Sequence, residues 1–240
     1  MKKIYYLLLL IAFVPMACGI AGGKTIRGDG NMKTDNRPVS SFEGIDVSGN
    51  FDVFIKNDSA FGVRVEADEN LQEYILTKVD HGNLEIYTRN NVQLSSSGGV
   101  KIYVSGPGFS FLKSAGSNTL KSLNTISSAT SLEIKISGAG STQLAIQAPK
   151  VEVDISGACA LTLSGRTKDF DLESSGSTDA DCLQLLAENT SVDISGSGEA
   201  AVFASVKLAV EISGSADVRY RGKPAITKDI SGSGSLKKID

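Results

Sequence analysis

Apolar and polar residues alternate along the second half of the chain, and the alternation recurs around a repeated Ile-Ser-Gly segment. Apolar residues stand two positions before the isoleucine, at the isoleucine, and six and eight positions after it. Even spacings lie on one side of an extended strand, so the pattern predicts strands with one buried side. The segment or its serine variant begins at Ile136, Ile155, Ser174, Ile194, Ile212 and Ile230.

These start positions differ by 19, 19, 20, 18 and 18 residues, and a weaker copy begins at Ser114. A period near 19 is too short for helical repeats or propeller blades and is typical of one turn of a β-helix. Connections between parallel strands are nearly always right-handed. The sequence therefore predicts an all-β fold, a right-handed single-stranded parallel β-helix, with regular turns over residues 113–240.

The repeat also places its glycines and cysteines. Glycine two positions after the isoleucine is predicted on the inner face, at a corner where backbones approach closely. Cys159 and Cys182 fall four and eight positions after their segment starts, in different inward columns. An oxidising compartment would permit a disulfide, but side chains in different columns are too far apart, so two buried free thiols are favoured.

Residues 39–112 are rich in β-type alternation but less regular. Alternating apolar residues predict several strands, Asp80 to Asn83 predicts a turn between two of them, and Asp68 to Ile75 predicts one helical turn. Val47-Ser-Gly and Val104-Ser-Gly echo the later repeat. This part is interpreted either as irregular turns of the same solenoid or as a strand layer that caps it.

The first residues are typical of an export signal. Lys2 and Lys3 precede an apolar run that is too short to span a bilayer, and Ala17 stands directly before Cys18. Residues 1–17 are therefore predicted to be a lipoprotein signal peptide, and Cys18 the lipidated residue. Ordinary cleavage and secretion is the alternative. Residues 18–38 are Gly-rich and polar, which predicts a flexible tether.

The net charge of the chain bears on whether its partner is a nucleic acid. The formal net charge is −3. Removing residues 1–17, which hold two lysines, changes it by −2 to −5. Mild acidity argues against nucleic acid as a partner.

Two polar features have ordinary structural explanations. His81 is the only histidine, so a His-based triad or metal site would need it, but it stands in the expected turn without partners. Outward serines follow the isoleucine in each repeat, and small hydroxyl residues fit tight corners. A hydroxyl surface for water or sugar is the weaker interpretation. No residue is assigned as catalytic.

Carboxylates recur at the outward position before the isoleucine. After Lys135, this column reads Asp154, Glu173, Asp193, Glu211 and Asp229, and Glu133, Glu152 and Asp171 stand two residues earlier in their repeats. Stacked carboxylates repel one another weakly in water, and a solvated face is the simplest interpretation. The functional alternatives are a Ca²⁺ site, because Ca²⁺ prefers several oxygen ligands, or a surface for a basic partner.

The residues from 37 to 240 resemble the family described as "putative auto-transporter adhesin, head GIN domain". The resemblance rests on Arg37 to Ile45, Val47 to Val53, Asn83 to Ile86 and the Ser-Gly-Ser-Gly repeats, in that order. It implies a β-helical fold, an envelope location and no established enzymatic activity.

Together these features predict a non-catalytic envelope lipoprotein. It would be anchored in the outer membrane, facing the periplasm or the cell surface, and would bind a glycan, protein or matrix component. The alternatives are a polysaccharide-active enzyme, which would need carboxylates clustered in a groove, and a structural or envelope-stress protein without a small ligand. No cofactor is expected apart from the Ca²⁺ considered above, and the sequence leaves the oligomeric state open.

Overall fold

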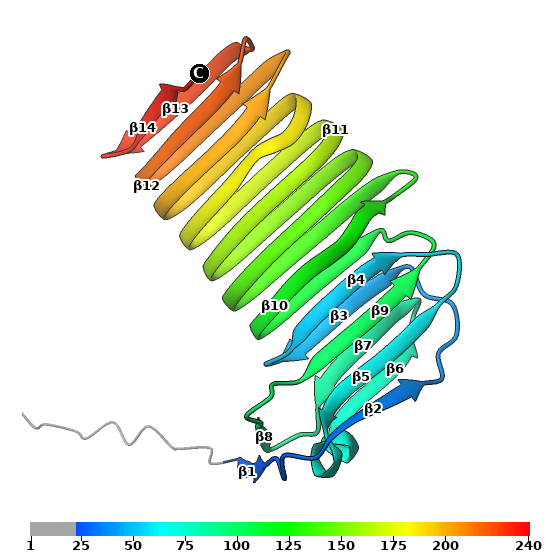
Figure 1. Ribbon diagram of the computed structural model, residues 1–240. Helices are drawn as coiled ribbons and strands as arrows, with labels where there is room; N and C mark the ends of the chain where they lie inside the picture. Colours follow the sequence, from blue (N-terminus) through cyan, green and yellow to red (C-terminus); the bar gives the residue numbers. More distant parts are fainter. Residues whose placement is uncertain (1–22) are drawn as a thin grey trace, which may run out of the picture.

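The computed structural model describes residues 23–240 and confirms an all-β chain (Figure 1). Strands form a large open sheet of mixed direction and a separate two-stranded sheet. Among the described residues the helical segment is the 3₁₀ helix η1 (Glu69–Tyr74), in agreement with the expected helical turn. No helix in this part of the chain is both long and apolar enough to cross a membrane.

Fourteen strands follow the chain in order. They are β1 (Lys24–Arg27), β2 (Met32–Arg37), β3 (Gly44–Gly49), β4 (Asp52–Asn57), β5 (Gly62–Asp68), β6 (Ile75–Asp80), β7 (Asn83–Thr88), β8 (Val92–Ser95), β9 (Lys101–Gly106), β10 (Phe111–Ser127), β11 (Ser131–Ala204), β12 (Lys207–Gly222), β13 (Ala225–Gly232) and β14 (Ser235–Lys238).

Strands β10 to β14 stack in parallel with a register that advances by one repeat at each step. Phe111 pairs with Glu133, Asn189 with Lys207, and Lys207 with Ala225. The long strand β11 bends through several repeats, which Figure 1 shows as bands lying one after another. Each repeat of 18 to 22 residues is called a coil below. The predicted repeat is therefore also the repeat of the structure.

A column of glycines runs through the stack at the third residue of the repeated segment. Gly116 is in register with Gly49 and Gly138, and Gly214 with Gly196 and Gly232. At Gly157 the backbone has a φ of +129°, and an added Cβ would collide with the backbone of Gly138 in the preceding coil. Close approach at a corner is confirmed. The placement on the inner face is wrong, because the corner glycines are exposed or half-buried.

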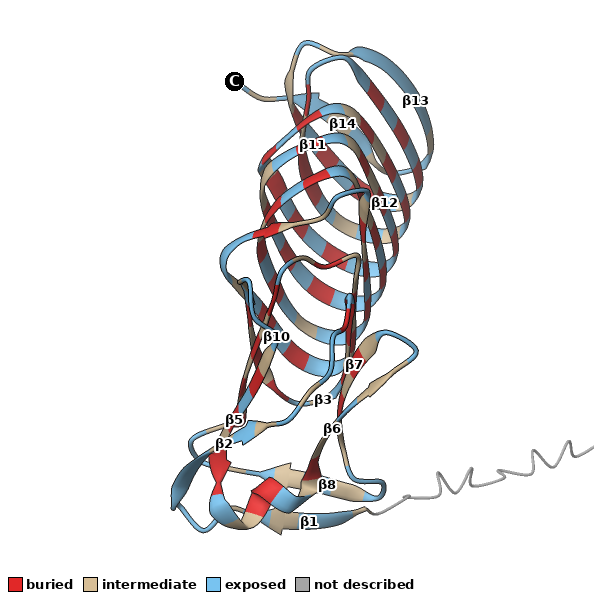
Figure 2. Cartoon of the chain, turned by 90° about the vertical axis from the view of Figure 1, so that its right-hand side faces the viewer, coloured by how far each residue is buried: buried red, intermediate tan, exposed pale blue. Residues whose placement is uncertain are grey.

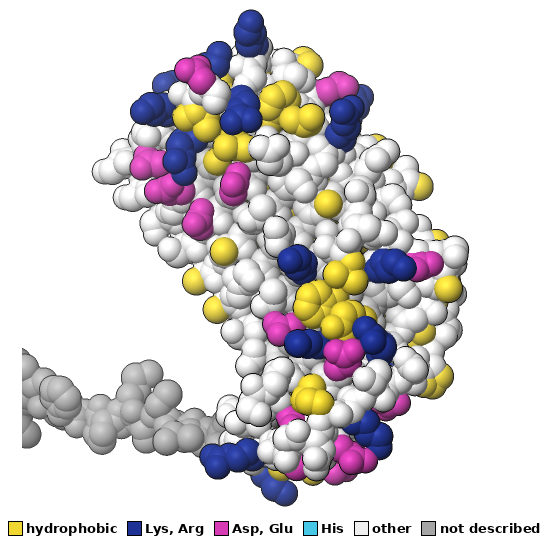
Figure 3. Space-filling model, viewed as in Figure 1, with side chains coloured by type: hydrophobic (Ala, Val, Ile, Leu, Met, Phe, Trp, Pro, Cys, Tyr) yellow, Lys and Arg dark blue, Asp and Glu magenta, His cyan; other side chains and the backbone are white. Residues whose placement is uncertain are grey.

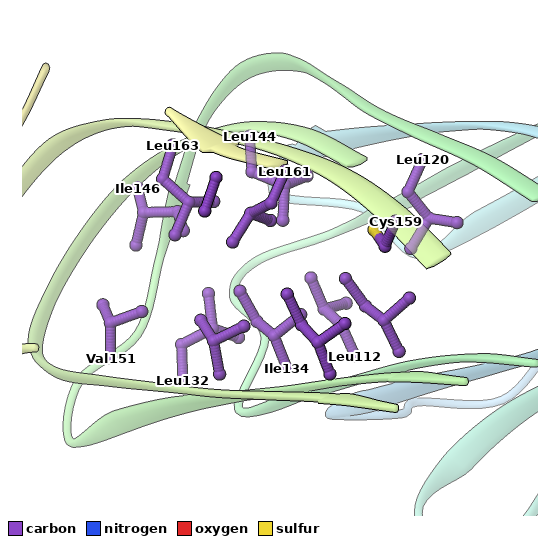
Figure 4. Close-up of a cluster of buried hydrophobic side chains, with 14 of the residues drawn as sticks. Leu112, Leu120, Leu132, Ile134, Leu144, Ile146, Val151, Cys159, Leu161 and Leu163 are labelled. Carbon is purple, nitrogen blue, oxygen red and sulfur yellow. The ribbon is translucent and has the colours of Figure 1, made fainter. Parts of the chain in front are cut away.

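Side chains on either side of this corner alternate as predicted. Figure 2 shows buried and exposed residues taking turns along the coils. The isoleucine position and the position two residues earlier are buried from Ile134 to Ile212, and the chain leaves the pattern at the exposed Lys228. Figure 4 shows the result, in which Leu112, Leu132 and Ile134 of one wall point toward Leu144 and Leu161 of the other.

Two pairs of polar side chains enter this interior. Where serine replaces isoleucine at Ser114, Asn118 four residues later donates a hydrogen bond to its hydroxyl at 3.1 Å. Ser174 is likewise hydrogen-bonded to Thr178. Because each polar side chain has a partner, these substitutions keep the column buried without an unsatisfied hydroxyl.

Both cysteines of the repeats are free and buried, which confirms the predicted thiols. Burial raises the pKa of the Cys159 thiol to about 11, and it raises the pKa of Cys182 as well. Both therefore stay protonated near neutral pH and act as small apolar side chains.

The N-terminal part combines the two expected arrangements. Strands β3 and β4 pair in parallel with β10, so they extend the stack, and Val47 takes its place in the isoleucine column opposite Ser114. Val104 does not join that column, since it pairs with Ile55. Strands β2, β5 and β6 add antiparallel pairs.

Residues 24–37 form strands and are not part of a flexible tether, so the predicted bounds of the tether are wrong. Strand β2 pairs antiparallel with β5, and β1 pairs in parallel with β8, so the segment belongs to the fold. Its partners lie about 26 or more residues away in sequence, which is why its polar composition resembled a linker. The predicted signal peptide, Cys18 and the first tether residues lie outside the described residues.

Replacing Gly157 with alanine tests the glycine column. We expect Gly157→Ala to lower the free energy of unfolding by more than about 3 kcal/mol, because the backbone strain adds to the collision with the preceding coil. Gly82→Ala is the control: Gly82 also has a positive φ, +79°, but has open space around its Cβ direction. Urea unfolding should show the larger loss for Gly157→Ala, and equal losses would refute the stacking argument.

Candidate functional site

The predicted carboxylate column lies along a shallow groove on the outside of the stack. The groove has a volume of about 800 Å³ and runs from the coil of Glu133 to that of Asp229. All five residues of the predicted column line it: Asp154, Glu173, Asp193, Glu211 and Asp229. The pairs Asp193–Glu211 and Glu211–Asp229 are in direct cross-strand register. This surface is called the acidic groove below.

Short side chains account for the hollow. In the first coils the position three residues before the segment start holds the long side chains of Glu133 and Glu152. In later coils it holds Ser191, Ala209 and Thr227, which leave space beside the carboxylates. The sequence carries this change, but it becomes a groove only once the coils are stacked.

Lysines neutralise one end of the groove. Lys135 Nζ lies 2.6 Å from Glu133, and Lys150 Nζ lies 2.6 Å from Glu152 and 3.2 Å from Asp171. The hydrogen bond with Glu133 raises the pKa of Lys135, and the charge of Asp154 adds to the shift. Among the described residues the carboxylates from Glu173 onward have no such ion pair. Lys228 lines that end of the groove without pairing with a carboxylate of residues 23–240, so negative charge is least neutralised there.

The lining has a strong charge imbalance. Eight carboxylates and two lysines line the groove, which gives a formal charge of −6. The whole chain has a formal charge of only −3, so acidity is concentrated on this face. Such a surface attracts cations and basic segments over about 8–10 Å at physiological salt.

The geometry of the carboxylates is that of a row. Within residues 23–240, no three His, Cys, Asp or Glu side chains converge closely enough to hold a metal ion. Ca²⁺ takes six to eight oxygen ligands around one point. The carboxylates instead follow one another along a line, one coil apart.

The other candidates remain apart from the groove. His81 lies in the β6–β7 turn with φ +47°, and its Nδ1 is 3.0 Å from Asp80 Oδ1. The outward serines, from Ser175 to Ser233, are exposed along the corner beside the glycine column. The structure brings neither His81 nor these serines into the lining of the acidic groove.

The structure resembles solved proteins over nearly all its length. A putative adhesin from Bacteroides fragilis matches with a TM-score of 0.80 at 21% identity, covering 89% of this chain and 100% of its own. A putative adhesin from Parabacteroides distasonis matches with a TM-score of 0.67 at 21% identity, covering 90% and 100%. A putative lipid binding protein from Parabacteroides distasonis matches with a TM-score of 0.63 at 27% identity, with the same coverage.

Sequence comparison agrees with this likeness. The family model described as "Putative auto-transporter adhesin, head GIN domain" matches residues 41–224. Comparison with curated proteins gives no match. The family and the solved neighbours carry the names of adhesins or binding proteins, which are typical of exported or cell-surface proteins.

Repulsion within the carboxylate column is expected to lower the thermal stability of the protein. Glu211 lies between Asp193 and Asp229, so we expect Glu211→Gln to raise Tm by about 1–2 °C at low salt. The gain should disappear at high salt, because screening removes the repulsion. Asp171→Asn is the control and should give no gain, since Asp171 pairs with Lys150. Thermal unfolding followed by circular dichroism measures both, and a salt-independent gain would contradict the electrostatic cause.

Proposed function

Since this chain belongs to the family of the auto-transporter adhesin head GIN domain, we propose that it is a non-catalytic binding protein of the cell envelope. Its coils would form a rigid support, and its ligand would bind along the outer faces of the coils. The acidic groove is the observation that carries this proposal. It is continuous across successive coils, and its carboxylates come from a rigid strand column rather than from loops.

The support is proposed to be a right-handed single-stranded parallel β-helix. Parallel register advances by one coil at each step through β10, β11, β12 and β13. Each coil returns to a position beside its own start, which is how such a helix winds. The hand follows from the general rule for connections between parallel strands.

The ligand of the acidic groove is proposed to be a basic segment of a protein or matrix component. Lysine and arginine side chains can reach carboxylates spaced by one strand separation, about 4.8 Å, along an extended partner. Charge-assisted hydrogen bonds to several carboxylates would then form along one line. An extended basic segment satisfies the row without requiring the carboxylates to converge.

Binding of a labelled decalysine peptide tests this proposal. Fluorescence anisotropy at low salt should show binding, and Asp193→Ser/Glu211→Ser should weaken it about tenfold, because the centre of the row is lost. Asp179→Ser/Asp181→Ser is the matched control, with the same charge change on a face outside the groove. If both double variants bind the peptide equally, net charge and not the groove accounts for binding.

The proposed location is the outer membrane, through lipid on Cys18. The apolar run before Ala17 and Cys18 supports this anchor. We expect Cys18→Ser to move the protein from the membrane fraction to the soluble fraction of expressing cells. Mass spectrometry of the mature N-terminus provides the direct measurement. An unmodified N-terminus elsewhere in the wild-type protein would exclude the anchor while leaving the binding proposal intact.

A further inference from the structure

A second groove lies on the outer side of the N-terminal strands, away from the acidic groove. It has a volume of about 480 Å³ and is lined by residues of β2, β4, β5 and β9, by the segment between β4 and β5, and by Leu123 of β10. Figure 3 shows hydrophobic side chains gathered near β4 and β9, with basic and acidic side chains around them. Leu123 is 52% exposed and Phe61 is 36% exposed, so two large exposed apolar side chains border the same groove.

A row of side chains crosses five strands beside this groove. Cross-strand register joins Asn36, Arg64, Tyr103, Phe54 and Lys121 in that order. The rings of Phe54 and Tyr103 stack with centroids 5.0 Å apart, and the Arg64 guanidinium lies 4.1 Å from the centre of the Tyr103 ring. Both faces of Tyr103 are thus covered by neighbours in the row. The apolar surface left for a ligand comes from Phe61, Leu123 and the remaining parts of Phe54.

The polar groups of the groove have opposite charge to those of the acidic groove. Three cations, Arg37, Lys56 and Arg64, and one acid, Asp58, line it, a formal charge of +2. All three cations are ion-paired: Lys56 lies 2.6 Å from Asp58, Arg64 lies 3.0 Å from Glu66 and Arg37 lies 3.2 Å from Asp35. Asp35 and Glu66 stand beside the groove and offset the charge of its lining. Each of these cations has further N–H donors, because an ammonium has three and a guanidinium five.

We propose that this groove binds an acidic saccharide, a sugar chain that carries carboxylate groups. A sugar ring has an apolar face of C–H groups and hydroxyls at its edge. The C–H face would lie against Phe61, Leu123 and Phe54, where weak C–H contacts to aromatic rings are favourable. The carboxylate would accept hydrogen bonds from Arg64 and Lys56, which are about half exposed. The exposed amide of Asn36, which makes no side-chain hydrogen bond within the described residues, would bind a hydroxyl.

The shape and charge of the groove favour this occupant over a membrane surface. The volume lies in the range of about 300–1,000 Å³ that is typical of small-molecule sites. A membrane-binding surface instead needs protruding apolar side chains that enter the lipid. Here Phe61 and Leu123 both border a hollow. The N–H donors that Arg64 and Lys56 keep beyond their own ion pairs complement carboxylates.

Isothermal titration calorimetry with oligogalacturonate tests the proposal on the whole protein. We expect binding that is tighter than that of a neutral galactose oligomer of equal length. Tyr103→Ala should weaken binding about three- to tenfold, because it removes the stacked support of Phe54. Arg64→Gln should remove the preference for the acidic sugar and provides a test that does not depend on Tyr103→Ala folding.

Tyr87→Ala is the matched control. Tyr87 is also an outward tyrosine of a strand, with Lys78 Nζ 5.9 Å from its ring, but it lies outside the groove. It should leave binding unchanged. Equal affinity for the acidic and neutral sugars, or equal effects of Tyr87→Ala and Tyr103→Ala, would overturn the proposal. So would Tyr103-dependent binding to phosphatidylglycerol vesicles without binding to oligogalacturonate.

The two grooves can be judged separately. Asp193→Ser/Glu211→Ser should not weaken binding of oligogalacturonate, and Arg64→Gln should not weaken binding of decalysine. Loss of sugar binding in the acidic-groove variant would place the saccharide there and overturn this inference. If only the decalysine experiment fails, the saccharide proposal is unaffected.

Discussion

Backbone contact between successive coils is the constraint on which the rest of the structure depends. At each corner the chain of one coil passes so close to the next that only hydrogen fits in place of a side chain, from Gly116 to Gly232. The same contact keeps the strands in parallel register, so equivalent positions lie above one another. The buried columns, the carboxylate row and the acidic groove are consequences of this register, because each consists of one position of the repeat that recurs in successive coils.

This dependence explains how much could be predicted from the sequence. The repeat in residues 113–240 gave the inward columns, the free thiols of Cys159 and Cys182, and the carboxylates of one outward column, since each needs only a periodic register. The glycines were placed on the wrong face because strict alternation assumes extended backbone, and a residue with φ near +129° departs from it. Alternation resumes beyond the corner, so the error did not spread.

The N-terminal part was less predictable because its pairing has no period. Nothing in the local sequence of Met32 to Arg37 indicates β5 as its partner, and the segment looks like a linker until that pairing is known. For the same reason the row from Asn36 to Lys121 could not be found from sequence. Its members come from five strands, and only the antiparallel pairing of β5 with β9 brings Arg64 to Tyr103. The hollow beside the carboxylates could not be predicted either, because it forms only when the coils stack, although the short residues Ser191 and Ala209 can be read from the sequence.

The separation of charge between the two grooves follows from the same division of the fold. In the regular part, an outward position that holds a carboxylate in several repeats places like charges one strand apart. Each further coil with a carboxylate at that position adds one negative charge to the same face. Irregular strands have no such column, and in them Arg64 and Lys56 alternate with Glu66 and Asp58 as paired ions. This is why we propose an extended ligand for the regular part, where equivalent groups recur at a constant spacing. For the irregular part we propose a compact ligand, since these strands place an aromatic ring, a guanidinium and an amide side by side.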